Sequence, residues 1–315
     1  MQPDDLPLLP KAELHVHLEG AVRPATLEEF ASRAGVSIPR TFTDLNSFIK
    51  VYEAAWRTMT HPGDYARMMR EYCEDAIRQG VRYAEIELSP IGRTYNHVAE
   101  ALEAAAQHPD IVVRFTVGNV RAFPIEVAWS MLEAVKDVPE FIAFGLGGSE
   151  SEFPPEPFQA VFAEARRRGL HSVPHAGEDA GPDSVRGAID ALGAERIQHG
   201  VRAVEDEALL EEIVERRIPL AVCPTSNLLL GVCATLDEHP LRRLWDTGAL
   251  VSVNTDDPGF FGCDLTGEYA IAGRLLGLDR AGYAQLARNS VESSFAPDEL
   301  KEELRLEIEG WERER

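Results

Sequence analysis

Short apolar, β-prone runs alternate with helical patterns along most of the chain. Several of the helical stretches end at a glycine, which is typical of helix C-termini. The pattern predicts eight strands, at residues 12–18, 81–88, 111–117, 141–146, 170–175, 196–199, 218–223 and 249–254. Between them it predicts helices, for example at residues 154–168, 184–192, 206–216 and 239–247. Eight strands that alternate with helices favour an α/β fold of the (β/α)8 TIM-barrel type.

Two segments interrupt this alternation. Residues 19–80 are longer than one crossover helix requires, and they contain an apolar stripe at helical spacing over residues 64–79. Residues 265–315 consist of further helical patterns, the last of them charged and amphipathic. We therefore expect one domain over residues 1–315, with 19–80 as a helical cap-like insertion and 265–315 as extra C-terminal helices. A doubly wound sheet is disfavoured because no glycine-rich phosphate turn follows an early strand.

Composition narrows the functional class. The chain has 315 residues, 44% of them hydrophobic, and a formal net charge of −22. Nucleic-acid binding requires a basic surface, so we expect no nucleic-acid partner. No apolar run reaches the roughly 20 residues of a membrane span, and the first residues do not resemble a signal peptide. We therefore expect a cytoplasmic protein with no membrane partner. The sequence does not specify an oligomeric state. The four cysteines lack CxxC spacing and are expected to be free, buried thiols.

Candidate metal ligands lie at the ends of predicted strands. In the first strand Glu13, His15 and His17 alternate with apolar residues, so we expect all three to face the barrel interior. His175 ends the fifth strand, and Asp256 follows the eighth. Because a parallel barrel gathers its strand ends into one ring, these residues are expected to meet at its C-terminal mouth. Three imidazoles and one carboxylate are suitable ligands for a metal ion.

Three further polar residues are expected beside the ligands. Gly177 permits a tight turn that would bring Glu178 over the mouth, and Asp257 directly follows Asp256. His199 ends the sixth predicted strand and is either a fourth imidazole ligand or a residue behind the ligands. We favour the second position for His199, because three imidazoles, one carboxylate and a water already fill a five-coordinate site.

The donor set also predicts the number and kind of ions. Binuclear barrel hydrolases commonly use a lysine on the fourth strand to bridge two metals, and the fourth strand here, FIAFGLGGSE, has none. One ion is therefore expected. Imidazole and carboxylate ligands without a redox requirement favour zinc, with iron and manganese as alternatives.

Six segments together resemble those of the adenosine and adenine deaminase family within the metal-dependent amidohydrolases. They are ELHVHLEG, GGSE, HAGED, RIQHG, CPTSN and VNTDDP, in family order over residues 11–262. The resemblance implies a (β/α)8 barrel and the hydrolytic removal of the 6-amino group of a purine, with a small-molecule nucleoside or base as partner. It implies one zinc ion bound by residues matching His15, His17, His175 and Asp256.

The same resemblance implies roles for the neighbouring residues. Glu178 would protonate the ring nitrogen beside the reacting carbon, and His199 and Asp257 would orient the attacking water. His17, Glu19, Asp257 and the backbone of Gly148 would contact the substrate.

The motifs leave the substrate open. An adenosine-type nucleoside is the primary expectation, with adenine and a 5′-modified adenosine such as aminodeoxyfutalosine as alternatives. Adenosine deaminases usually carry an aspartate at the position of Glu19, and that aspartate is associated with the ribose 5′-hydroxyl. The segment GGSE also resembles the adenine branch. The run PTSN at residues 224–227 and NTDD at residues 254–257 resemble the adenosine branch instead.

The sequence also bears on three other functional classes. A cytidine-type zinc deaminase is excluded because the chain has no PCxxC segment. A retired scaffold that only binds ligands is disfavoured because Glu178, His199 and Asp257 are all present. A different amidohydrolase reaction, such as hydrolysis of a ring amide or an ester, is the main chemical rival.

Overall fold

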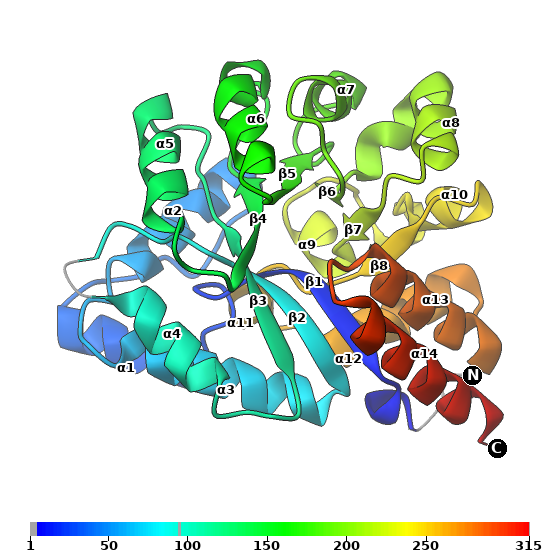
Figure 1. Ribbon diagram of the computed structural model, residues 1–315, viewed down its shortest axis with the longest axis horizontal. Helices are drawn as coiled ribbons and strands as arrows, with labels where there is room; N and C mark the ends of the chain where they lie inside the picture. The colour runs from blue at the N-terminus through cyan, green and yellow to red at the C-terminus, as the bar shows by residue number, and fades with distance from the viewer. Residues whose placement is uncertain (1–4, 94–95, 315) are drawn as a thin grey trace.

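Eight parallel strands form one barrel with helices around it (Figure 1). The computed structural model describes residues 5–93 and 96–314. Each strand pairs with its neighbour in sequence, so the order runs from β1 to β8. The strands are β1 Lys11–His17, β2 Val81–Leu88, β3 Val112–Val117, β4 Phe141–Leu146, β5 His171–Ala176, β6 Ile197–His199, β7 Leu220–Val222 and β8 Val251–Val253.

The barrel closes between β1 and the segment that follows β8. The backbone N–H of His17 donates to the carbonyl of Asp256 at 2.9 Å, and the N–H of Asp256 donates to the carbonyl of His15 at 3.0 Å. The side chain of Asn254 accepts from the N–H of Leu14 at 2.7 Å. The same bonds that close the barrel therefore hold two predicted metal-ligand segments side by side.

The predicted (β/α)8 fold is confirmed, and the strand boundaries differ mainly at the end of the chain. The last two predicted strands, at residues 218–223 and 249–254, contract to the three-residue strands β7 and β8. β7 begins only after Pro219 and ends before Cys223, the N-cap residue of the helix that starts at Pro224. A proline ring fixes φ and supplies no N–H for a ladder, but it suits the first turn of a helix.

The helices fall between and around the strands, with additional ones in the two segments that interrupt the alternation. Their bounds are α1 Pro24–Ala34, α2 Leu45–Trp56, α3 Asp64–Arg78, α4 His97–Ala105, α5 Ile125–Ala134, α6 Gln159–Arg167, α7 Pro182–Asp190, α8 Glu207–Glu215, α9 Pro224–Leu229, α10 Leu241–Asp246, α11 Pro258–Phe261, α12 Leu265–Leu276, α13 Arg280–Ser293 and α14 Asp298–Arg313.

The two interrupting segments have different positions. Helix α3 packs beside β2, and its buried stripe includes Tyr65, Met69 and Tyr72. Helix α13 packs against both β8 and β1, and α14 packs on α13. The two ends of the described chain lie close together (Figure 1), since the indole of Trp311 donates to the carbonyl of Asp5 at 3.2 Å. The cap-like role assigned to residues 19–80 stays a prediction.

Two smaller expectations concern membrane segments and cysteines. Among the described residues, no helix is long and apolar enough to cross a membrane. All four cysteines are free, and Cys73, Cys223 and Cys233 are buried. Cys263 differs from the expectation because it is only partly buried.

Candidate functional site

A cavity of about 340 Å³ opens at the C-terminal ends of the strands. This size falls within the ordinary range for small-molecule sites. Side chains of α2, among them Phe48 and Tyr52, form part of its wall. All but one of the residues predicted for the site line the cavity: His17, Glu19, Gly148, His175, Glu178, His199, Asp256 and Asp257. His15 is fully buried behind them.

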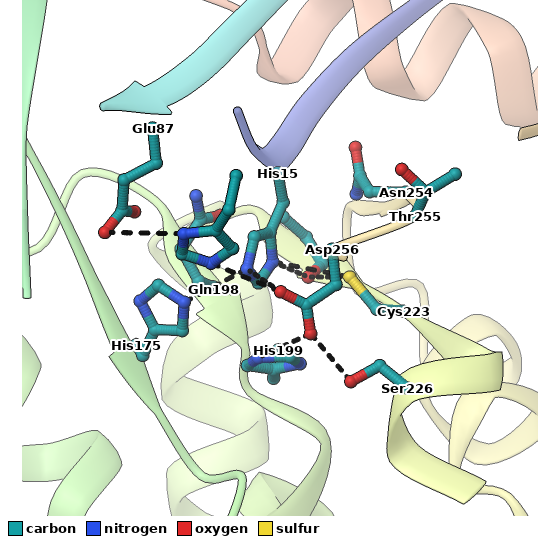
Figure 2. A network of polar contacts seen from close by, with 12 residues as sticks. His15, Glu87, His175, Gln198, His199, Cys223, Ser226, Asn254, Thr255 and Asp256 are labelled. Carbon is teal, nitrogen blue, oxygen red and sulfur yellow. Dashed lines mark hydrogen bonds and ion pairs between the residues drawn. The ribbon is translucent and has the colours of Figure 1, made fainter. Parts of the chain in front are cut away.

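Asp256 occupies the centre of this cluster (Figure 2). Its Oδ1 lies 3.3 Å from Nε2 of His15 and 3.2 Å from Nε2 of His17. The Nε2 atoms of His15 and His175 are 3.1 Å apart. The hydroxyl of Ser226 donates to Asp256 Oδ2 at 2.7 Å, which fixes the carboxylate from its other side. The four predicted metal ligands therefore converge from three separate parts of the sequence.

The backbone is unusual at two residues of this cluster. Three described non-glycine residues have positive φ, and two of them are His199 and Asp256, both at 63°. A side chain in this conformation is strained by about 1–3 kcal/mol, and such strain gathers at functional sites. His199 is the last residue of β6, and Asp256 follows β8 and forms a bridge with Val16 of β1.

The hydrogen bonds of His15 determine which of its nitrogens faces the cluster. Its Nδ1 lies 3.3 Å from the carbonyl oxygen of Ala221, an atom that only accepts hydrogen bonds. The proton of neutral His15 therefore belongs on Nδ1, and the lone pair on Nε2 points toward Asp256 and His175. A backbone carbonyl that fixes the tautomer in this way is typical of metal-binding histidines.

Four observations show that this donor set fits a metal ion. Ligand atoms of His15, His175, His199 and Asp256 all lie within 4.8 Å of one another. His17 joins the cluster through Asp256 and Asp257 in a second such group. In the described part of the chain, Nδ1 of His175, Oε1 of Glu178 and Oδ1 of Asp257 are buried without a hydrogen-bond partner. Burial also lowers the pKa of His175 well below its ordinary value, which favours the neutral imidazole that a metal requires.

Glu178 is held by the turn that follows β5. Gly177 has a φ of 71°, and a Cβ at this position would lie 2.6 Å from Val185, so only glycine fits. The carboxylate of Glu150 accepts from the backbone N–H groups of Gly177 and Glu178, each at 2.8 Å. Burial, and then the charge of Asp256, raises the pKa of Glu178 well above its ordinary value. A bound cation would oppose the effect of the Asp256 charge, but burial favours the protonated acid regardless.

The expectation that Glu13 shares the environment of the two histidines is wrong. Its carboxylate accepts from the hydroxyl of Tyr72 on α3, at 2.7 Å, and from Thr255. Helix α3 packs beside β2 in the surrounding layer. The pairing register of β1 shifts between Glu13 and Val16, so strict alternation does not hold along this strand.

Several contacts of the site were not predicted. The carboxylate of Glu19 accepts from the hydroxyls of Tyr52, at 3.3 Å, and Tyr65, at 3.0 Å. Both tyrosines come from the segment at residues 19–80. Tyr65 is part of the predicted apolar stripe there, and nothing in the local sequence indicates that either tyrosine contacts Glu19. Ser226 and Asn227 belong to the CPTSN segment, but their types alone do not specify a partner.

Comparison with known proteins gives the family. The sequence model described as "Adenosine deaminase" matches residues 10–311. The chain belongs to the adenosine deaminase family. It is a hydrolytic deaminase that acts on a C–N bond, within the metal-dependent amidohydrolases, and its relatives support purine deamination.

Two relatives with different names are similar to this deaminase to nearly the same degree. An aminodeoxyfutalosine deaminase of Streptomyces avermitilis is 40% identical over 326 residues, covering 96% of this chain and 91% of the relative. An adenine deaminase of Cupriavidus necator is 38% identical over 322 residues, covering 96% and 92%. Overall identity therefore does not distinguish between the two substrates.

Solved structures agree with the fold. An adenine deaminase from Arthrobacter aurescens superposes with a TM-score of 0.90 at 32% identity, covering 96% of this chain and 98% of that one. An amidohydrolase from Burkholderia ambifaria, described with bound Zn, has a TM-score of 0.85 at 27% identity, covering 98% and 91%. These matches confirm the predicted family and barrel.

Proposed function

We propose that this protein is a zinc-dependent deaminase that hydrolyses the 6-amino group of an adenosine-type purine nucleoside. Water adds to the ring carbon, the C–N bond breaks, and an inosine-type product and ammonia leave. The observation that carries the proposal is the convergence of His15, His17, His175 and Asp256 beside the buried acid Glu178 in one cavity.

The proposed zinc ligands are His15, His17, His175 and Asp256. When bound, zinc supplies the Lewis acidity that makes water nucleophilic near neutral pH. Support comes from the lone pair of His15 Nε2, which the Ala221 carbonyl leaves facing the cluster. The zinc reported for the Burkholderia ambifaria amidohydrolase agrees with this choice of metal.

The chain's own residues handle the protons. Glu178, protonated because of its burial, donates to the ring nitrogen beside the reacting carbon, so that this carbon accepts a nucleophile. Asp257, whose Oδ1 is buried without a partner, accepts a proton from the attacking water or a hydrogen bond from the purine. His199 completes the orientation of the water. The backbone of Gly148, which has a φ of 96°, lies along the cavity wall where the purine edge would rest.

A specific observation favours a nucleoside with an extended, largely apolar 5′ substituent as a second candidate. The outer cavity is mostly apolar, and its lining includes Leu45, Phe48, Ile49, Trp56 and Phe123. Among the described residues that line the cavity, Arg57 is the only lysine or arginine, so this part of the wall lacks the cationic cluster that a phosphate would require. An aromatic or aliphatic extension at the 5′ position would bury this surface.

Glu19 bears on the third candidate, adenine. Its carboxylate is buried and already accepts from two tyrosine hydroxyls, so it is a fixed acceptor on the cavity wall. A ribose hydroxyl and a ring N–H of the free base are both donors suited to such an acceptor. Glu19 therefore supports the binding of either a nucleoside or the free base. The apolar outer part of the cavity is the feature that distinguishes these two substrates.

The test is a comparison of kcat/KM for adenosine, adenine and aminodeoxyfutalosine on protein of measured zinc content. The proposal expects adenosine or its 5′-extended relative to exceed adenine, and no turnover of any of the three would refute it. Phe123→Ala should lower kcat/KM for the extended nucleoside more than for adenine. Trp129→Ala is the matched control, because Trp129 is similarly exposed but does not line the cavity.

A further inference from the structure

His199 is connected to a chain of buried polar groups that leads away from the cavity. Its Nδ1 lies 3.2 Å from Nδ2 of Asn227, and Oδ1 of Asn227 lies 3.1 Å from Nε2 of His239. Nδ1 of His239 accepts from the backbone N–H of Leu241 at 3.0 Å. Asn227 lies on α9 and His239 precedes α10, and neither side chain lines the cavity.

Only one arrangement of protons satisfies this chain. The Leu241 N–H is an obligatory donor, so Nδ1 of His239 must carry a lone pair and Nε2 of His239 must carry the proton. Nε2–H of His239 then donates to the amide oxygen of Asn227, which fixes the orientation of the amide. The amide N–H of Asn227 therefore donates to Nδ1 of His199.

The remaining proton of neutral His199 is consequently on Nε2, the nitrogen that faces the cavity. Nε2 lies 3.5 Å from Oε1 of Glu178 and 3.9 Å from Oδ2 of Asp256. A flipped Asn227 amide would place its N–H groups against the N–H of His239, an arrangement that leaves both buried groups unpaired. Burial lowers the pKa of His239 to about 4, in agreement with a neutral ring at this position.

We propose that Asn227 and His239 are positioning residues that hold His199 as the Nε2–H tautomer. His199 then donates a hydrogen bond to the attacking oxygen, and it neither removes a proton through Nε2 nor binds the metal through it. The distances alone do not separate these roles, because His199 lies within the same group of potential ligand atoms as His15, His175 and Asp256. The donor role toward the attacking oxygen rests on the proposed function, whereas the tautomer does not.

The direct test is nitrogen-15 NMR of histidine-labelled protein, with and without added zinc. The His199 signals are assigned by their loss in His199→Gln. We expect a pyrrole-type shift for Nε2 and a pyridine-type shift for Nδ1 in both samples. The opposite pattern, an imidazolium, or a zinc-dependent change of Nε2 to a metal-coordinated nitrogen would overturn the proposal. If no purine is turned over, the proposed function fails while this spectrum still decides the tautomer.

Two sets of variants connect the tautomer to activity. Asn227→Asp replaces the amide donor by an acceptor, so Nδ1 of His199 should become protonated and kcat should fall on the order of 100-fold, with KM changed less than about threefold. If His199 keeps the same tautomer in Asn227→Asp, the proposed role of this hydrogen-bonded chain is contradicted. His239→Leu removes the donor that orients Asn227, whereas His239→Gln keeps an N–H donor and should retain more of kcat. Equal losses in both would indicate a purely structural role.

A matched control is available at another histidine. His171 begins β5, at the end of the strand opposite the cavity, and pairs with Glu195 at the surface. His171→Leu is therefore expected to leave kcat and the His199 spectrum unchanged.

Discussion

Gly20→Ala tests whether the position of Asp257 is required for turnover. A Cβ on Gly20 would lie 1.7 Å from Oδ1 of Asp257, 2.6 Å from its Cγ and 2.8 Å from its Cβ. Ordinary van der Waals contact begins near 3.4 Å, so the carboxylate oxygen must move by roughly 1.7 Å. Rotation of the carboxylate alone does not relieve the overlap, because the Cβ of Asp257 is also too close.

The backbone of Gly20 has little freedom to retreat. Its carbonyl accepts from the N–H of Gly259 at 2.8 Å, and Asp257 itself is buried. Overpacking of this kind costs about 1–3 kcal/mol of stability. A displacement of about 1 Å at a reacting group costs on the order of 100-fold in rate. We therefore expect kcat to fall at least about 100-fold, with the protein still folded.

The assay measures kcat, KM and zinc content on the same preparation. Retained zinc with lost kcat would locate the defect at Asp257 and away from the metal ligands. Gly310→Ala is the matched control, because no atom lies within 4 Å of its added Cβ and it lies in α14. That variant should keep full kcat and gain up to about 1 kcal/mol of stability. A Gly20→Ala enzyme with kcat within threefold of the parent would refute the reasoning.

Three further outcomes are expected. Glu178→Gln keeps the shape but cannot donate an acidic proton, so the protein should retain zinc while kcat falls about 10²–10⁴-fold; near-normal turnover would remove Glu178 from its role. Asp256→Asn should lose its metal, as measured by elemental analysis. Treatment of the parent with a chelator should abolish turnover until zinc is restored, and full activity without bound metal would contradict the assignment. The side chains of Glu85 and Arg196 are fully buried, with Oε2 and Nη2 2.6 Å apart. Glu85→Gln leaves the charge of Arg196 unpaired, so the free energy of unfolding measured by urea titration should fall by about 3–5 kcal/mol. The half-exposed pair of Glu307 with Arg82 is its control, with less than about 1 kcal/mol expected for Glu307→Gln.

Much of the site was predictable because strand ends carry position information. In a barrel of eight parallel strands, every residue at the C-terminal end of a strand lies at the same mouth. His17, His175 and Asp256 could therefore be placed together before their contacts were known. The family resemblance added the roles. The alternation rule was less reliable, since the register shift in β1 gave Glu13 a partner on α3 in place of a position beside His15.

Substrate-determining contacts were harder to predict. Tyr52 and Tyr65 approach Glu19 from helices α2 and α3, and their amphipathic patterns are equally consistent with ordinary core packing. The orientation of such helices over the mouth depends on packing between distant segments, which periodicity does not encode.

The sequence by itself determined the barrel, the family and the residue types that meet at its mouth. Tertiary structure decided how those residues are protonated and supported. The carbonyl of Ala221 selects the tautomer of His15, and Asn227 with His239 selects that of His199. The physical reason is that an imidazole's chemistry depends on which nitrogen holds the proton, and that choice is made by hydrogen bonds from groups brought close only by folding.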